Sequence, residues 1–218
     1  MICVSLPFKT TGELIQGIRS LEEAIELVEV RLDLMEEFDL KGILNRLDRP
    51  AIFTCRSKKE GGSFSGDEST RVKILQQAID LGAPYVDVEI WCIDKIKKRS
   101  NTKIIGSFHD FKATPSEDKL LELYAEAKRA GADIVKLATM ANDQQDNAKM
   151  FRFLQKVPQG SAVGLCMGER GIVTRILGPK FGSLFSYACL DEKSSVAPGQ
   201  LSWDKMHNLY RVNSIDSN

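Results

Sequence analysis

The sequence predicts an α/β protein of the (β/α)8 barrel class, and two observations support this prediction. Short runs rich in β-branched and other apolar residues recur along the chain, and segments with the spacing of amphipathic helices lie between them. A chain of 218 residues that alternates strands with helices in this way is typical of one barrel, so we expect residues 1–218 to form a single domain. The predicted strands are 2–6, 27–32, 51–56, 85–90, 103–109, 133–138, 162–167 and 184–189.

Helix signals support the same alternation. The segment 65–82 has acidic residues in its first turn and stops at Gly82, and 114–131 begins after the N-cap residue Ser116 and stops at Gly131. Further helices are predicted over 142–157 and over WDKMHNLYR (203–211). A doubly wound open sheet is the alternative, but it usually has fewer strands at this length. A dinucleotide-binding GxGxxG is also missing after the first strand.

The composition argues against several classes of function. The 30 basic and 30 acidic residues give no net charge, which argues against a nucleic-acid partner. No apolar run approaches the ~18 residues of a membrane span, and the opening MICVSLPFKT does not resemble a signal peptide. The 5 cysteines form no CxxC pair and are expected to be reduced core thiols of a cytoplasmic protein. Only 2 histidines are present, without a ligand cluster, so no metal site is predicted.

Charged side chains interrupt four of the predicted strands, in LVEVRLD (27–33), IFTCRS (52–57), IIGSFHDF (104–111) and GADIVKLATM (131–140). Because side chains alternate along a strand, charged residues such as Glu29 and Arg31 share the face opposite Val28 and Val30. Barrel enzymes place catalytic groups where strands end. The polar residues late in their strands should therefore converge at the mouth, although a purely structural layer of ion pairs is the alternative. These residues are Glu29, Arg31, Arg56, Glu89, His109, Lys136 and Met167.

Lys136 lies in the middle of an apolar strand. Burial disfavours its ammonium form, and neighbouring arginines would act in the same direction, which would leave a neutral amine. Such an amine attacks carbonyl groups and forms a Schiff base. His109 ends the preceding strand and is therefore expected beside Lys136, where an imidazole suits proton transfer. Glu60 follows Arg56 by four residues and is placed to orient His109.

With these residues placed, the sequence resembles the type I 3-dehydroquinate dehydratases of the shikimate pathway, which leads to chorismate and the aromatic amino acids. The resemblance covers essentially the whole chain. It rests on EVRLD, FTCRSKKEGG, HDF, DIVKLA, GLCMGERGIVTRILGPKFG and APGQ, in this order. It implies a class I aldolase-like (β/α)8 barrel, a cytoplasmic homodimer, and no metal or organic cofactor. The family also occurs as the N-terminal part of fusions with shikimate dehydrogenase, which the sequence leaves open.

The resemblance also implies individual roles. Lys136 would attack the C3 ketone of 3-dehydroquinate. His109, paired with Glu60, would remove a C2 proton and assist loss of the C1 hydroxyl as water, giving 3-dehydroshikimate. Arg175 would bind the substrate carboxylate, and the remaining substrate-binding residues would be Glu29, Arg31, Arg56, Met167, Gln200 and Ser195.

One position departs from the family pattern. Members often have a serine four residues before the glutamine of APGQ, but Val196 stands there in this chain, and Ser195 is one residue away. Two other functions remain as alternatives. One is another Schiff-base enzyme of the class I aldolase-like type. The other is a catalytically silent barrel that binds a ligand.

Overall fold

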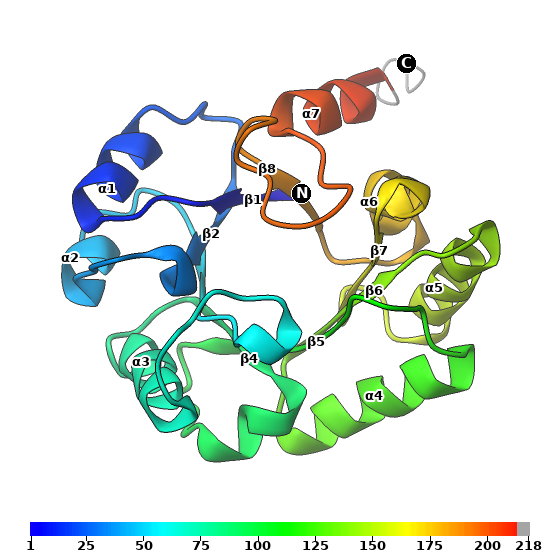
Figure 1. Cartoon of the computed structure of the whole chain (residues 1–218), viewed down its shortest axis with the longest axis horizontal. Helices are drawn as coiled ribbons and strands as arrows, with labels where there is room; N and C mark the ends of the chain where they lie inside the picture. Colours follow the sequence, from blue (N-terminus) through cyan, green and yellow to red (C-terminus); the bar gives the residue numbers. More distant parts are fainter. Residues whose placement is uncertain (213–218) are drawn as a thin grey trace.

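Eight parallel strands form one sheet that curls into a barrel, with helices around its outside (Figure 1). The computed structural model describes residues 1–212, so residues 213–218 of the predicted domain lie outside the described part. Each predicted strand is present, and its bounds differ from the prediction by at most two residues. The strands are β1 (Ile2–Leu6), β2 (Leu27–Arg31), β3 (Ala51–Thr54), β4 (Tyr85–Glu89), β5 (Lys103–Asp110), β6 (Ile134–Met140), β7 (Ala162–Met167) and β8 (Ser186–Cys189).

The barrel is nearly closed. Neighbouring strands pair in the order β7-β6-β5-β4-β3-β2-β1-β8, which leaves a seam between β7 and β8. Two hydrogen bonds bridge this seam just before β8. The Leu184 amide donates to the Ala162 carbonyl at 2.8 Å, and the Gly164 amide donates to Ser183 Oγ at 3.3 Å. The fold class predicted from the sequence is therefore confirmed.

Alternation along the strands separates two apolar clusters. Val28, Val30 and Val86 point outward into the larger cluster, which packs beneath the helices. Ile52 and Ile105 point inward and belong to a smaller cluster in the barrel lumen, together with Ile134, Val163 and Phe185. The smaller cluster fills the lumen below the polar residues, so it forms the floor of the site.

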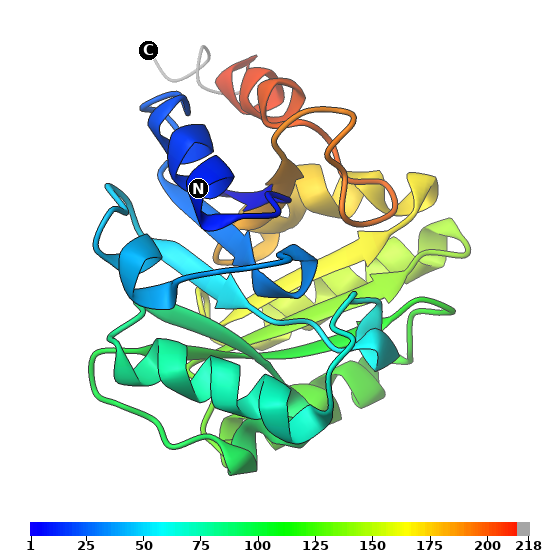
Figure 2. The same ribbon diagram turned by 60° about the vertical axis from the view of Figure 1, so that its left-hand side comes forward.

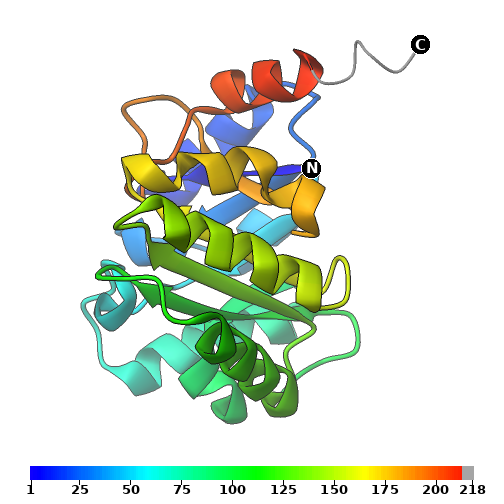
Figure 3. The ribbon, with the colours of Figure 1, turned by 90° about the vertical axis from the view of Figure 1, so that its right-hand side faces the viewer.

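Helices cover the outside of the sheet, as Figures 2 and 3 show from two further directions. The predicted helices are present as α3 (Glu68–Asp80), α4 (Glu117–Ala130), α5 (Gln144–Lys156) and α7 (Trp203–Val212). Ser116 caps α4, because its side chain accepts from the Lys119 amide. Three short helices were not predicted: α1 (Thr11–Arg19), α2 (Leu40–Leu44) and α6 (Ile172–Leu177). Between β4 and β5 the chain forms only the 3-10 helix η3 (Ile90–Lys95).

The carboxyl ends of all the strands meet at one end of the barrel, because the strands are parallel. The loop that follows β8, residues 190–202, arches over this end, and the start of the chain lies at the other (Figure 3). The loop is docked on the turn after β7, where the Gly168 amide donates to the Pro198 carbonyl at 3.1 Å. Gly199 has a φ of +71°, and a Cβ there would collide with the Gly168 backbone, so this docking requires glycine.

Candidate active site

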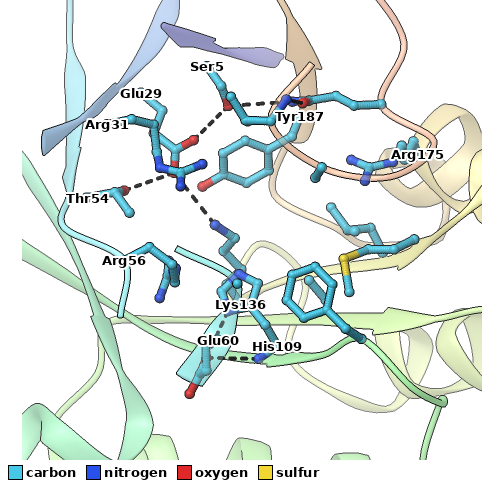
Figure 4. Close-up of a pocket in the computed structure, with 18 residues that line it drawn as sticks. Ser5, Glu29, Arg31, Thr54, Arg56, Glu60, His109, Lys136, Arg175 and Tyr187 are labelled. Carbon is cyan, nitrogen blue, oxygen red and sulfur yellow. Dashed lines mark hydrogen bonds and ion pairs between the residues drawn. The ribbon is translucent and has the colours of Figure 1, made fainter. Parts of the chain in front are cut away.

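A cavity opens at the carboxyl ends of the strands, beneath the loop 190–202 (Figure 4). The charged residues that interrupt the strand sequences meet in it. Its walls also include aromatic and aliphatic side chains from β6, β7, β8 and the loops. The lining residues are Ser5, Glu29, Arg31, Thr54, Arg56, Glu60, Gly61, His109, Phe111, Lys136, Ala138, Leu165, Met167, Arg175, Tyr187, Val196, Ala197 and Gln200.

Lys136 is a buried lysine on β6, with only 6% of its surface exposed. Its Nζ lies 3.0 Å from Asp87 Oδ2 and 3.7 Å from Glu29 Oε1. The same nitrogen sits 4.3 Å from the centre of the Tyr187 ring. The prediction of a neutral amine counted burial and arginines but omitted these two carboxylates. These two carboxylates place negative charge beside the amine, and the neutral amine stays a prediction.

Asp87, on β4, connects β5, β6 and the segment after β3 beneath the cavity. Its Oδ1 accepts hydrogen bonds from Arg56 Nη2 at 2.6 Å and from Ser107 Oγ at 2.5 Å, while Oδ2 binds Lys136. Burial alone would raise the pKa of Asp87, but the charges of Arg56 and Lys136 outweigh burial and hold the pKa well below its usual range. Asp87 is therefore a fixed negative charge beside the lysine.

His109 and Glu60 form a hydrogen-bonded pair on the opposite wall. His109 Nδ1 lies 2.9 Å from Glu60 Oε2, and the His109 amide donates to the same oxygen at 3.0 Å. Burial, together with the charges of Arg56 and Lys136, lowers the pKa of His109 well below its usual value. Burial also raises the pKa of Glu60 to about 7, although the charge of Arg56 acts against this. A neutral imidazole that donates from Nδ1 keeps Nε2 as a free base.

His109 and Lys136 come from paired neighbouring strands. In the register of β5 and β6, Ser107 lies opposite Lys136 and His109 lies opposite Ala138. His109 is therefore one inward-facing position nearer the mouth than Lys136. A molecule bound between the loop and the lysine would meet both groups.

Glu29 links the strands to the loop above the cavity. Its carboxylate accepts hydrogen bonds from Ser5 Oγ at 2.6 Å and from Thr54 Oγ1 at 2.9 Å. Gln200 Nε2 donates to Ser5 Oγ at 3.5 Å, and Gln200 Oε1 accepts from the Val196 amide at 3.1 Å. Glu29 and Gln200 thus belong to one hydrogen-bond network on this wall.

Two arginines at the cavity differ in their partners. Arg31 forms a two-pronged ion pair with Asp33, at 2.9 Å and 2.8 Å. Arg175, on α6, is 1% exposed and forms no ion pair with any described residue. Its Nη2 donates to the Pro198 carbonyl at 3.2 Å, and its Nε has no hydrogen-bond partner. Burial lowers the pKa of Arg175 to about 10. An anionic group in the cavity would supply the missing partner.

Comparison with known proteins assigns the family. The family model described as type I 3-dehydroquinase matches residues 2–217. This chain belongs to the type I 3-dehydroquinase family. A 3-dehydroquinate dehydratase of Methanocaldococcus jannaschii is 36% identical over 97% of this chain and 98% of its own length.

Other members of the family show the same relationship. A bifunctional 3-dehydroquinate dehydratase/shikimate dehydrogenase of Arabidopsis thaliana is 40% identical over 92% of this chain, which spans only 35% of that protein. The crystal structure of a 3-dehydroquinate dehydratase from Geobacillus kaustophilus has the same fold, with a TM-score of 0.84 and 24% identity. The two structures overlap over 100% of this chain and 92% of the other.

Most of the predicted site residues line the cavity of this family member, but two do not. Glu89 is buried below the cavity, where Arg71 holds its carboxylate at 2.5 Å and the Ser57 amide donates to it at 3.0 Å. The expectation that Glu89 reaches the mouth is therefore wrong. Ser195 also lies outside the cavity, and its hydroxyl donates to the Ala197 carbonyl. Val196 forms the cavity wall at this point. The role of Ser195 as a substrate ligand therefore stays a prediction, and this loop arrangement does not support it.

Several residues in or directly beneath the cavity were not assigned a role from the sequence. Alternation along β4 indicated that Asp87 faces inward, but not that it reaches Lys136 across the lumen. Tyr187 gave no signal, because it stands in an apolar run. Its hydroxyl is buried and has no hydrogen-bond partner among the described residues. Phe111 covers Gly61, which sits in a left-handed turn with φ +78° beside Glu60.

A cluster of metal ligands and a membrane-spanning helix are both absent from residues 1–212. No group of three or more His, Cys, Asp or Glu side chains is arranged there to hold a metal ion. No helix of that part of the chain has the length and apolar character that crossing a bilayer requires.

Proposed function

We propose that this chain eliminates water from 3-dehydroquinate to give 3-dehydroshikimate, through a Schiff base on Lys136. The observation that carries the proposal is a buried lysine whose cavity also contains the His109–Glu60 pair. The family assignment supplies the substrate. Every role below is part of this proposal.

The reaction begins at the amine. After Lys136 gives up a proton, its nitrogen attacks the C3 ketone, and loss of water leaves a protonated imine. This imine carries the same positive charge as the ammonium ion, so Asp87 and Glu29 stabilise it in the same place. The imine withdraws electrons from C2 and acidifies its C–H bond.

His109 then moves the proton. Its free Nε2 takes the C2 proton, and the electron pair forms an enamine with the imine nitrogen as the electron sink. The imidazolium returns the proton to the C1 hydroxyl, which leaves as water. Glu60 holds the Nδ1 proton and stabilises the imidazolium while it exists. Hydrolysis of the imine releases the product and restores Lys136. Because the imine is the electron sink, this route needs no metal or organic cofactor.

Arg175 is proposed to bind the substrate carboxylate. Among the cavity arginines it is the one with no ion-pair partner within residues 1–212, and a carboxylate would satisfy its Nε together with a terminal nitrogen. Glu29, Arg31, Arg56 and Gln200 would surround the ring hydroxyls, with Met167 packing on the ring.

A direct assay tests the proposal. The purified chain is mixed with 3-dehydroquinate, and the absorbance of the conjugated enone product is followed. Absorbance should rise with wild-type protein and stay flat with Lys136→Ala, which should still bind the substrate. No rise with wild-type protein would contradict the proposed activity.

The same assay separates the alternatives. An aldolase-like enzyme would use the same lysine to cleave carbon–carbon bonds of sugar phosphates and would leave 3-dehydroquinate unchanged. A silent binding barrel would bind the carboxylate ligand tightly and form no product. We further propose a single domain over 1–218, a homodimer, and a cytoplasmic location, which gel filtration and cell fractionation would test.

A further inference from the structure

We propose that Trp91 is a positioning residue for this site, because its indole N–H holds Glu60 in the orientation in which Glu60 orients His109. This inference rests on the proposed roles of Glu60 and His109. Trp91 does not line the cavity, so it would act through Glu60 and not on the substrate.

The contact joins two loops at the mouth of the barrel. Glu60 belongs to the 3-10 helix η2 (Lys58–Glu60), which follows β3, and Trp91 belongs to η3, which follows β4. Trp91 Nε1 donates to Glu60 Oε1 at 2.8 Å. The other oxygen, Oε2, accepts from the His109 amide and from His109 Nδ1. Each oxygen thus has its own donors, and the Trp91 contact fixes the oxygen that His109 leaves free.

The indole is itself held by cations. Lys59 Nζ lies 5.1 Å from the ring centre, and Arg71 Cζ and Lys95 Nζ each lie at 5.5 Å. Cations near an aromatic face are attracted to its electrons, which strengthens the N–H as a donor. Trp91 is 37% exposed, so burial of the ring does not explain its placement. The hydrogen bond and the surrounding cations do explain it.

The hydrogen bond from Trp91 to Glu60 should affect the ionisation of Glu60, which can be measured. Glu60 must be ionised to accept the Nδ1 proton of His109 and to stabilise an imidazolium. A hydrogen bond donated to the carboxylate favours that form. The titratable groups that act on Glu60 from the neighbouring elements are Arg56 after β3, Asp87 and Glu89 on β4, and His109 on β5.

Removing the Trp91 N–H donor should therefore raise the pH at which Glu60 ionises. Trp91→Phe keeps an aromatic ring at this position but removes the five-membered ring that carries the N–H donor. Glu60 then ionises at higher pH, so the acid limb of kcat/KM should move upward by about one pH unit, the scale of one charge-assisted hydrogen bond. Activity should fall up to about tenfold on that limb, while kcat above it and KM stay close to wild type.

Trp203→Phe is the matched control. The sequence contains 2 tryptophans, and Trp203 stacks on His207 in α7, away from Glu60. This variant should keep the wild-type pH profile. A Trp91→Phe profile that superimposes on that of Trp203→Phe would overturn the proposal.

A second measurement does not need turnover. In Trp203→Phe protein, Trp91 is the remaining tryptophan, and its emission should titrate with the protonation of Glu60. The titration should disappear when Glu60→Gln is added. An emission that titrates identically in both proteins would overturn the proposal. Absent turnover in the wild type, with this titration intact, would instead contradict the proposed function alone.

Discussion

Arg175→Met is expected to stabilise the protein without substrate while impairing its function. The guanidinium is 1% exposed and has no ion pair with a described residue. Burial lowers its pKa from the usual arginine range to about 10, a difference worth about 3 kcal/mol. At pH 7 the group is charged in both the folded and unfolded chain, so this cost is fully present in the folded state.

The net gain is smaller than this cost. Methionine loses the hydrogen bond to the Pro198 carbonyl, worth about 1–2 kcal/mol. We therefore expect a gain of about 1–2 kcal/mol, or roughly 3–6 °C in Tm for a chain of this size. Loss of the carboxylate partner should raise KM by at least about 30-fold, since removing one side of a buried charge pair costs about 2–5 kcal/mol.

Arg71→Met is the control, because Arg71 is equally buried but fully paired. Arg71 binds Glu89 at 2.5 Å and Glu68 at 2.6 Å. Its removal should lower stability by about 3 kcal/mol, because it strips a partner from the buried Glu89. Thermal unfolding and steady-state kinetics measure both effects. If Arg175→Met is as unstable as Arg71→Met, or keeps the wild-type KM, the reasoning is refuted.

Three further predictions concern pH and buried polar groups. Glu60 has a pKa of about 7 and must be ionised for the proposed reaction, so kcat/KM should fall with decreasing pH around a midpoint near 7. If Glu60→Gln keeps this fall at low pH, the fall belongs to another group. Asp87→Asn should lower the free energy of unfolding at pH 7 by about 3 kcal/mol. The depressed pKa of Asp87 means that its stabilisation is present above pH 3.8 and is lost on further acidification; a denaturant midpoint equal to wild type at pH 7 would contradict this. Tyr187→Phe removes a buried hydroxyl without a partner and should raise stability by about 1 kcal/mol, whereas a lower Tm would show that the hydroxyl has a partner.

The strands were predictable because inward and outward residues differ so clearly in this barrel. Val28 and Val30 pack outward while Glu29 and Arg31 face the lumen, and this alternation can be read directly from EVR. The short helices were not predictable. In α6, IVTRIL begins with three β-branched residues, which favour a strand, and packing of the chain on β7 overrides that preference.

The site was predictable along single strands but not across the lumen. Alternation placed His109 and Lys136 on the inward faces of their strands, and the pairing of these two strands brought them into one cavity. The contact of Asp87 with Lys136 spans β4 and β6, which are not paired, so no local pattern reports it. Glu89 was misplaced for a related reason, because Arg71 on α3 and Arg56 after β3 both pair with its carboxylate below the cavity.

The central claim is that the Lys136 amine forms a covalent imine with the substrate. Borohydride is added to the protein with 3-dehydroquinate, and peptide mass spectrometry locates the reduced adduct. The ligand mass should appear on the peptide that carries Lys136 and be lost in Lys136→Met. An adduct on another lysine, or turnover that continues in Lys136→Met, would contradict the account.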